Sequence, residues 1–373
     1  MHCPWEHDVR RTSGLLSDGR EILYFDRDDA PVRTAPDERA LDGGAAIGEL
    51  RFDAFTGEWI AIAGHRQSRT HLPKASECPL CPTTDGLLSE IPESTYDVVV
   101  FENRFPSLRS ADGTWKLPNA ELGSSAPAVG RCEVVCFSSD HRGSFTELSS
   151  EQASLVIDAW TDRTAALQAL PYIRQVFPFE NRGEEIGVTL HHPHGQIYGY
   201  SYLPPRIARL LESERAHFTR TGRHLIADVI AFEREDGRRI VFETEHWVCF
   251  VPFAARWPFE VQLHPLRSGV HDFTELNAAE RSELAALLPR LLRAFDGLLQ
   301  LHMPYVAGWF QAPCNGAAEE REGMTFHLQL QSNRRAANKL KFPAGSEMSM
   351  WAYISDVPPE QSAEQLRAAW ATA

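Results

Sequence analysis

The chain has no run of about 18 apolar residues, which is the length that a helix needs to cross a bilayer. Its first residues, MHCPWEHDVRRTSG, also lack the basic and then apolar layout of a secretory signal. These absences argue against a membrane protein and against export. We therefore expect a cytoplasmic protein without a membrane partner.

Cysteine is scarce, with 7 in 373 residues, and an odd number does not suit a framework of disulfides. We expect metal binding or buried thiols instead. The few cysteines therefore become candidates for a site.

Positive charge is also in deficit, because 37 Lys and Arg face 51 Asp and Glu, and the formal net charge is −14. Proteins that bind nucleic acid usually present a basic face, so nucleic acid is excluded as the main partner. An anionic ligand has to be bound locally. Arginines occur close together in GHRQSRTH, although a solvated surface cluster is the alternative there.

A chain of 373 residues is long enough for two packed units or for one large unit with an internal repeat. Residues 1–45 are rich in Asp, Arg, Gly and Pro, and we expect an extension that lies on the body without a function of its own. Apolar spacing predicts an amphipathic helix at 149–170. Runs of Val, Ile, Tyr and Phe bounded by turn residues predict strands around it at 58–64, 96–103, 132–138, 172–181 and 195–203.

The order of these elements recurs in the second half of the chain. SFTELSSEQ at 144–152 matches DFTELNAAE at 272–280, and a long helix is predicted at 273–301. We interpret this as an internal repeat of a sheet with a helix packed on one face, although a chance recurrence of a common helix start is the alternative. The strands of the second copy are predicted at 246–253, 259–266, 305–313 and 325–332.

The stretch HHPHGQIYGY at 191–200 places three histidines within four residues. Alternate side chains of a strand share a face, so His192, His194 and Gln196 are expected on the same side. Pro193 suits the start of a strand, where a ligand can reach. A single histidine on a strand is usually a hydrogen-bonded structural residue, but three polar groups on one face favour a site.

ECPLC supplies Cys78 and Cys81 at the Cys-x2-Cys spacing of half a zinc site. The sequence has no second such pair, so histidines have to complete the set. His141 follows a predicted strand in CFSSDH, and His192 lies in the next candidate motif. The four residues predict a structural zinc site with every position filled, which leaves His194 free.

A free imidazole at His194 is suited to nucleophilic attack, because the neutral form predominates at neutral pH. Attack on phosphorus forms a phosphohistidine and divides one difficult displacement into two easier steps. Gln196 is a candidate hydrogen-bond donor to a phosphoryl oxygen, and Arg66 or Arg69 can bind phosphate charge through the guanidinium. These residues together predict a group-transfer enzyme.

The motifs that carry this chemistry resemble those of a known family. FENRGEEIG followed by HHPHGQIYGYSYLP, with TGEWIAIAGHRQSR, ECPLC, FENRFPSL, CFSSDH and WPFEVQLHP, is similar to the galactose-1-phosphate uridylyltransferase family of the histidine-triad superfamily. The resemblance covers about residues 48–370. It implies an α+β fold with two histidine-triad-like halves and a mainly antiparallel sheet. The expected parts are an extension at 1–45, an N-terminal half at 46–205 with the catalytic and zinc residues, and a C-terminal half at 206–373 with a hexose-contacting segment.

The resemblance also implies a homodimer and ping-pong transfer of UMP from UDP-glucose to galactose 1-phosphate in galactose metabolism. His194 corresponds to the nucleophile and Gln196 to the amide that contacts the phosphoryl group, and the family's zinc ligands correspond to the four residues named above. The last three of the substrate-contacting positions are expected to contact the hexose across the dimer. These positions are Arg66, Arg69, Leu80, Asn103, Phe105, Val134, Asn181, Thr189, Lys341, Phe342 and Glu347.

Two departures from the family pattern carry predictions. Some members bind a second metal, and the corresponding positions here are Leu210, Phe310, Gln329 and Gln331. We therefore expect this second site to be absent and the second half to be catalytically silent. Where some members have a tyrosine at the hexose, this chain has Ser346, which leaves the acceptor sugar open.

Three other functions stay open at this point. An ADP-sugar phosphorylase would use the same histidine chemistry to pass AMP to inorganic phosphate, and activity on UDP-glucose against ADP-glucose would separate the two. A histidine-triad nucleotide hydrolase would let water take the intermediate and release UMP. A nucleotide-binding protein without activity would tolerate His194→Gly.

Overall fold

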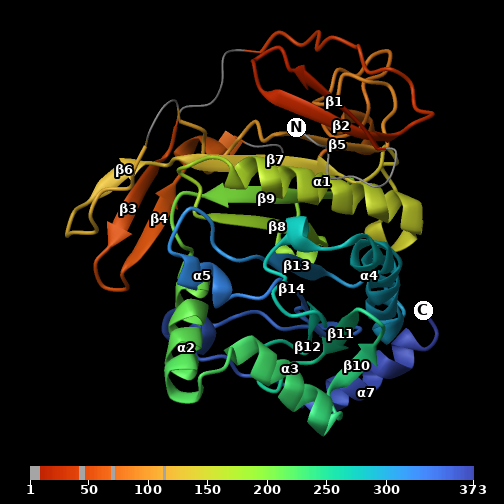
Figure 1. Cartoon of the computed structure of the whole chain (residues 1–373). Coiled ribbons are helices and arrows are strands. Elements are labelled where there is room, and N and C mark those ends of the chain that lie inside the picture. Colours follow the sequence, from red (N-terminus) through yellow and green to blue (C-terminus); the bar gives the residue numbers. More distant parts are fainter. Residues whose placement is uncertain (1–8, 42–46, 69–71, 112–114) are drawn as a thin grey trace.

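The computed structural model describes residues 9–41, 47–68, 72–111 and 115–373. One large sheet of eleven strands runs through the molecule (Figure 1). Each strand pair in this sheet is antiparallel. The α+β class with a mainly antiparallel sheet is therefore confirmed.

The two halves of the chain supply the two halves of this sheet, which join where β8 pairs with β13. The strands of the first half are, in spatial order, β1 (Val9–Leu15), β2 (Glu21–Arg27), β5 (Val98–Glu102), β7 (Gly130–Cys136), β9 (His194–Tyr200) and β8 (Gln175–Arg182). The second half continues with β13 (Tyr305–Phe310), β14 (His327–Ser332), β12 (Phe259–Pro265), β11 (Trp247–Phe250) and β10 (Ile240–Glu243).

Helices cover both faces of the sheet. Helices α1 (Ser150–Gln168), α4 (Ala278–Leu299) and α7 (Pro359–Trp370) pack on one face and on one another. On the other face α2 (Pro205–Thr221) buries Ile207 against Phe310 of β13. Further helices are α3 (Leu225–Asp236), α5 (Ala318–Glu322) and α6 (Gly345–Met350), and short 3-10 turns are η1 (Gly64–Ser68), η2 (Ala75–Glu77), η3 (Phe145–Glu147), η4 (Glu184–Ile186) and η5 (Phe273–Glu275).

Two smaller sheets lie beside the main one. The first has the order β4 (Glu58–Ile62), β3 (Glu49–Asp53) and β6 (Ser125–Pro127), and the second is the hairpin of β15 (Arg334–Ala336) and β16 (Lys339–Leu340). The β3–β4 hairpin leads directly into η1, which carries Arg66 of the predicted site.

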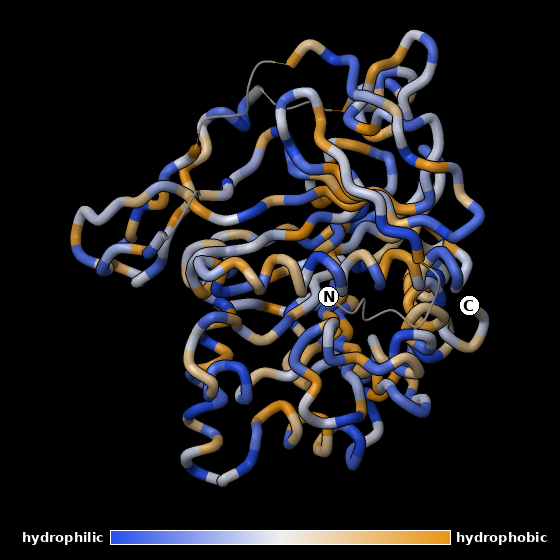
Figure 2. Tube along the Cα trace, turned by 45° about the horizontal axis from the view of Figure 1, so that its top comes forward, coloured by the Kyte–Doolittle hydropathy of each residue, from blue (hydrophilic) through white to orange (hydrophobic). Residues whose placement is uncertain are grey.

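Alternation along β5 shows how the sheet separates two apolar cores. Val98 and Val100 face the helices α1 and α4, whereas Val99 and Phe101 face the opposite side. Because both faces are covered, the strand is apolar almost throughout. Figure 2 shows apolar segments running through these central strands.

The internal repeat is visible in the starts of the two long helices. η3 and η5 form from the repeated Phe-Thr-Glu, and the side chains of Ser144 and Asp272 accept hydrogen bonds from the backbone N–H of the threonine. Ser149 caps α1 and Asn277 caps α4 in the same way. The predicted order of strand, helix and strand therefore holds in both halves.

The N-terminal extension differs from the expectation. Instead of lying on the body, it supplies β1 and β2 to the main sheet, where Ile22 of β2 lies opposite Phe101 of β5. The apolar patch EILYF explains this, because Leu23 and Phe25 enter one core while Ile22 and Tyr24 enter the other.

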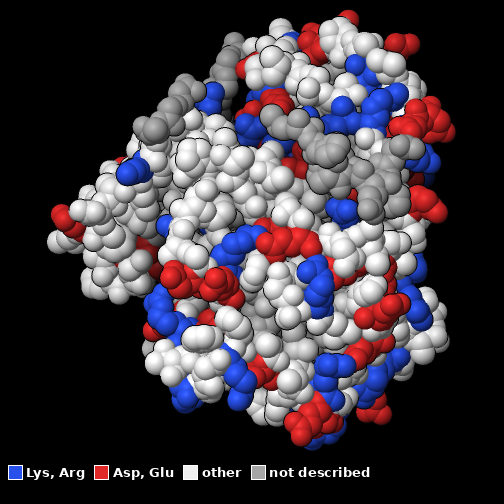
Figure 3. Space-filling model, viewed as in Figure 1, with Lys and Arg blue, Asp and Glu red and all other residues white. Residues whose placement is uncertain are grey.

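Charges of both signs are interspersed over the face shown in Figure 3, with no continuous basic stripe. Within the described residues, no helix combines the length and the apolarity that crossing a membrane requires.

Candidate active site

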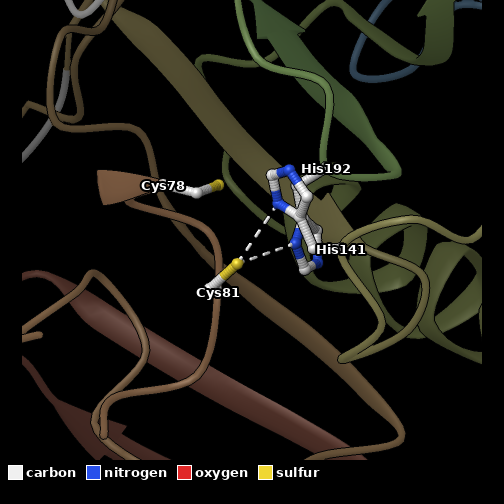
Figure 4. Close-up of side chains that lie close together, drawn as sticks. All are labelled: Cys78, Cys81, His141 and His192. Atoms are coloured by element: carbon white, nitrogen blue, oxygen red, sulfur yellow. Dashed lines mark hydrogen bonds between the residues drawn. The ribbon is translucent and has the colours of Figure 1, made fainter. Parts of the chain in front are cut away.

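Two cysteines and two histidines from three parts of the chain meet below one face of the sheet. Cys78 and Cys81 lie in the turn after η2, His141 follows β7, and His192 lies two residues before the start of β9. Figure 4 shows the four side chains pointing toward one another, and one donor atom of each lies within 4.8 Å of all the others. The structure thus brings together the four predicted zinc ligands.

The donor set fits a metal ion of the zinc type. The Cys81 Sγ atom lies 3.3 Å from His141 Nδ1 and 3.6 Å from His192 Nδ1, close to the edges of a tetrahedron around zinc. Burial, together with the neighbouring Cys78, raises the pKa of Cys81 to about 12. A bound cation would offset the cost of placing two thiolates side by side.

The ring of His192 is oriented by contacts on the side away from the cysteines. Its Nε2–H donates to the Ser138 carbonyl oxygen at 2.8 Å, which leaves the Nδ1 lone pair facing Cys81. The Tyr96 hydroxyl lies 2.9 Å from the same Nε2 and donates to the same carbonyl at 2.8 Å. Such outer contacts select the tautomer that a metal ligand needs.

His194 is the first residue of β9, and its tautomer is also determined by the backbone. Its Nδ1–H donates to the His192 carbonyl oxygen at 2.7 Å, so Nε2 carries the lone pair. Within the described residues no hydrogen bond reaches that Nε2 atom. Burial lowers the pKa of the imidazole, which favours its neutral form.

Gly195 allows the strand to pass through this crowded place. A Cβ atom there would lie 2.8 Å from the Phe137 ring and 2.9 Å from the Phe179 carbonyl oxygen. Any larger residue would push β9 away from its neighbours and displace the two histidines beside it.

A cavity of about 140 Å³ opens in front of His194. Both predicted catalytic residues line it, and so do six of the predicted substrate contacts. These eight are His194, Gln196, Arg66, Leu80, Asn103, Phe105, Val134 and Thr189. Leu80, Phe105 and Val134 form apolar walls that suit a planar base, whereas Gln196 and Thr189 lie with the histidine.

Arg66 brings a positive charge to this cavity. Its Nη1 donates to the Phe105 carbonyl oxygen at 3.0 Å and to the Ser107 hydroxyl at 2.7 Å. These acceptors are neutral, so they orient the guanidinium without cancelling its charge. Asn103 uses its side-chain oxygen to accept from the Phe105 N–H at 2.8 Å, which shapes the wall of the cavity.

A second cavity of about 710 Å³ reaches His194 from another side, and Asn181 lines it. Arg182 lies there too, but both of its terminal nitrogens bind Asp296 at 2.9 Å. Arg182 is therefore engaged in a structural ion pair rather than offered to a phosphate. Arg69 lies outside the described residues.

The three predicted hexose contacts lie away from both cavities. Lys341 pairs with Glu347 at 3.2 Å, and Phe342 is 63% exposed. Neither cavity at His194 includes them within this single chain. Ser346 donates to the Ala352 carbonyl oxygen at 2.8 Å.

The four positions of the expected missing metal site have other contacts. Leu210 and Phe310 belong to an apolar cluster below α2. Gln329 accepts from Arg206 and lies 3.0 Å from His327, and Gln331 lies opposite Val306. The absence of a second metal stays a prediction.

Some residues of the cavity were not among the predicted contacts. Glu90, Phe101, Arg104 and Leu190 line it beside the predicted residues. Arg104 lies between two predicted contacts in ENRF, so the motif could have indicated that it lines the cavity. Glu90 belongs to no motif, and it is found only through the fold.

The imidazole of His194 is neutral and has a free lone pair. It lies beside a Cys2His2 cluster and at a cavity with apolar walls and an arginine. This arrangement is typical of nucleotidyltransferases that act through histidine. Comparison with known families makes this specific. Residues 44–204 match the N-terminal domain of galactose-1-phosphate uridyl transferase, and residues 211–372 match its C-terminal domain. The chain belongs to the galactose-1-phosphate uridylyltransferase family and is an enzyme of nucleotidyl transfer.

Individual relatives agree with this. A galactose-1-phosphate uridylyltransferase of Streptomyces lividans is 44% identical over 366 residues, which cover 96% of this chain and 98% of that protein. One of Thermotoga maritima is 38% identical, covering 86% of this chain and 98% of its own. A solved uridylyltransferase structure superposes with a TM-score of 0.75 at 29% identity, covering 87% of this chain and 99% of the other.

A solved ADP-glucose phosphorylase from Arabidopsis thaliana also has this fold, with a TM-score of 0.64 at 22% identity. It covers 86% of this chain and 98% of its own. This likeness concerns the fold alone.

Proposed function

We propose that the protein transfers a uridylyl group from UDP-glucose to galactose 1-phosphate in galactose metabolism, with His194 as the nucleophile. The observation that carries the proposal is the contact between His194 Nδ1 and the His192 carbonyl oxygen. It leaves the Nε2 lone pair free at the cavity that Gln196 and six of the predicted substrate contacts line. The relatives in Streptomyces lividans and Thermotoga maritima are named for this activity.

The reaction has two displacements at the α-phosphorus of the nucleotide. In the first, a bond forms between His194 Nε2 and phosphorus, and the bond to the bridging oxygen breaks, so glucose 1-phosphate leaves with the electron pair. In the second, a phosphate oxygen of galactose 1-phosphate attacks phosphorus and Nε2 leaves. Gln196 donates to a phosphoryl oxygen, and Arg66 and Arg69 stabilise the phosphate charge.

The cofactor in this proposal is zinc, bound by Cys78, Cys81, His141 and His192. With all four positions filled by protein, the ion would be structural and would hold the loop around His192. The nucleophile is the side chain of His194 and not the metal ion. His192 orients that side chain through its backbone carbonyl oxygen.

The hexose contacts are proposed to come from a second copy of the chain. Lys341, Phe342 and Glu347 lie outside the cavities at His194 in their own subunit. The segment that carries them also exposes Met348, Met350 and Trp351, an apolar surface that suits an interface. The proposed protein is therefore a homodimer. In each active site the catalytic residues come from the half at 46–205 of one subunit, and the hexose contacts come from the half at 206–373 of the other. Thiolate ligands and sugar nucleotide substrates suit the cytoplasm.

The test uses UDP-glucose labelled in the uracil, with no acceptor present. The metal-loaded protein should become labelled on His194, and galactose 1-phosphate should remove the label as UDP-galactose. If the folded, metal-loaded protein takes up no label, the proposal is wrong.

The same experiment separates the alternatives. An ADP-sugar phosphorylase would be labelled by ADP-glucose instead and discharged by inorganic phosphate. A hydrolase would release free UMP at a rate that galactose 1-phosphate does not change.

A further inference from the structure

The N-terminal strands lie against the wall of the nucleotide cavity, although they precede the residues that match the family's N-terminal domain model, which begin at 44. Leu16, Ile22 and Tyr24 share one buried cluster with Leu80 and Phe101, which line the cavity. The Thermotoga maritima relative is covered over 98% of its length but covers only 86% of this chain. The extension therefore lies outside the matched domain models, beside the substrate site, and the Streptomyces lividans relative, which covers 96% of this chain, aligns with most of it.

The closest link between the extension and the cavity is Glu90. This residue lines the cavity and is only 6% exposed. Arg20 binds one of its carboxylate oxygens at 2.7 Å, and Arg39 binds the other at 2.7 Å. Both arginines come from the extension, so two charges from outside the matched domain model fix one carboxylate inside the site.

The two arginines are themselves fixed. Arg20 also donates to Asp18 at 2.7 Å and to the Glu102 carbonyl oxygen at 2.8 Å. Arg39 also binds Asp37 at 2.8 Å. A buried carboxylate with this many ordered partners is rigid, and removing one partner leaves charge buried without compensation.

Arg104 is what this rigid carboxylate holds on the cavity side. Its Nη1 lies 3.7 Å from Glu90, and its guanidinium lies over the Phe105 ring at 5.6 Å. The side chain is 46% exposed, so the remaining N–H groups are available. Uridine carries oxygen acceptors at its ribose hydroxyls and at two base carbonyls, and these match guanidinium donors.

We propose that Arg20 and Arg39 position Glu90, and that Glu90 holds Arg104 where it donates to an oxygen of the bound uridine. The proposal rests on the nucleotide site of the proposed function. Arg20, Arg39 and Glu90 are positioning residues, and Arg104 is the residue that touches substrate. In this proposal the extension contributes to substrate binding in addition to its structural role in the sheet.

The two half-reactions separate this role from a merely structural one. Free enzyme gains uridine contacts when it binds UDP-glucose. The uridylyl-enzyme already holds the uridine, so the second half-reaction neither gains nor loses those contacts. Loss of the positioning residues should therefore affect kcat/KM for UDP-glucose and spare kcat/KM for galactose 1-phosphate.

The variants are Arg39→Ala, Arg39→Lys, Glu90→Gln and Arg104→Ala, in the full-length, metal-loaded protein. We expect Arg39→Ala, Glu90→Gln and Arg104→Ala to lower kcat/KM for UDP-glucose by about 10-fold, with kcat/KM for galactose 1-phosphate within about 2-fold of wild type. Arg39→Lys should recover part of the loss. The matched control is Arg27→Ala, because Arg27 also joins the extension to the body, through Asp97 at 2.8 Å, but is 62% exposed.

Binding of UMP by calorimetry supplies a readout that needs no turnover, and the same three variants should weaken it by about 10-fold. Unchanged UMP binding in folded Arg39→Ala and Glu90→Gln proteins would overturn the proposal, as would an equal loss in both half-reactions. Failure of the proposed function looks different, because wild type itself would then form no uridylyl-enzyme or would bind AMP in place of UMP.

Discussion

The carbonyl oxygen of His192 accepts a hydrogen bond of 2.7 Å from Nδ1 of His194, while the ring of His192 belongs to the Cys/His cluster. One residue therefore serves the cluster through its side chain and the adjacent imidazole through its backbone. Interactions that hold the His192 ring in place therefore also help to position the carbonyl oxygen that selects the His194 tautomer.

Replacing His194 by Gln should remove the nucleophile without disturbing the cluster. The ring contributes nothing to the four donor atoms, so the metal content and the melting temperature should match wild type. We expect uridylyl transfer to fall by at least about 10³-fold. Mass spectrometry of the protein after UDP-glucose treatment should show a uridylyl adduct in wild type only. An adduct on the variant would place the nucleophile elsewhere.

The local part of this site was readable from the sequence, because strand alternation and the Cys-x2-Cys spacing are short-range patterns. One detail differed, since β9 begins only at His194 and His192 lies before the strand. The Pro193 carbonyl oxygen still accepts a hydrogen bond from the N–H of Phe137, so the chain already runs beside the end of β7 there. His192 reaches the Cys/His cluster and His194 reaches the cavity, but only His194 lies on the strand.

The parts that sequence reasoning missed depend on distant contacts. Glu90 forms ion pairs with Arg20 and Arg39, which are far away in the sequence. The spacing of apolar and polar residues cannot predict such a pairing. Helix α2 likewise carries an ordinary amphipathic pattern, but its place on the sheet depends on the cluster around Phe310. These features follow from which surfaces meet in the folded chain rather than from any local motif.

Replacing Cys78 by Ser should release the metal ion. The protein should lose about one equivalent of zinc, measured by elemental analysis, because three ligands bind far more weakly than four. We also expect a lower melting temperature and a slower first half-reaction, since His192 would no longer be held. Cys314→Ser is the control, because Cys314 is not one of the four donors and its sulfur donates to the Ile173 carbonyl oxygen at 3.2 Å, a bond that serine keeps. Equal zinc in both variants would refute the ligand assignment.

Arg66 should be needed for its charge and for its shape. Its Nη1 donates to the Phe105 carbonyl oxygen and to the Ser107 hydroxyl, so Arg66→Ala loses the support of the cavity wall together with the proposed phosphate contact. We expect kcat/KM for UDP-glucose to fall by about 10- to 100-fold, with Arg66→Lys in between. Arg51→Ala removes a nearby but exposed arginine paired with Glu49, and steady-state kinetics should show it close to wild type.

Glu180 should make the stability of the protein depend on pH. Burial raises the pKa of this carboxyl from 4.5 to about 7, and the hydroxyl of Tyr305 and the charge of Arg182 offset this only in part. Between these two values the folded protein binds more protons than the unfolded chain. The free energy of unfolding should therefore fall as the pH rises from about 4.5 to 7, by up to about 3 kcal/mol.

The variant Glu180→Gln removes this dependence. Urea unfolding at pH 5, 6 and 8 should show that the free energy of unfolding of the variant rises relative to that of wild type as the pH rises. Glu184→Gln is the control, because that side chain is exposed and pairs only with His191 at 3.2 Å. Parallel curves for wild type and Glu180→Gln would show that the carboxyl is ionised throughout.

The segment at Lys341 and Phe342 should act on the active site of the partner subunit. If so, a heterodimer of the His194→Gln chain with a chain carrying Lys341→Ala and Phe342→Ala has one site where His194 and the hexose segment are both intact. Random mixing makes half of the dimers hybrid, so about a quarter of wild-type activity should appear after the two inactive proteins are unfolded and refolded together. The same mixture without refolding is the control. If each subunit used its own segment, every site in the hybrid would carry a defect, and activity would not return.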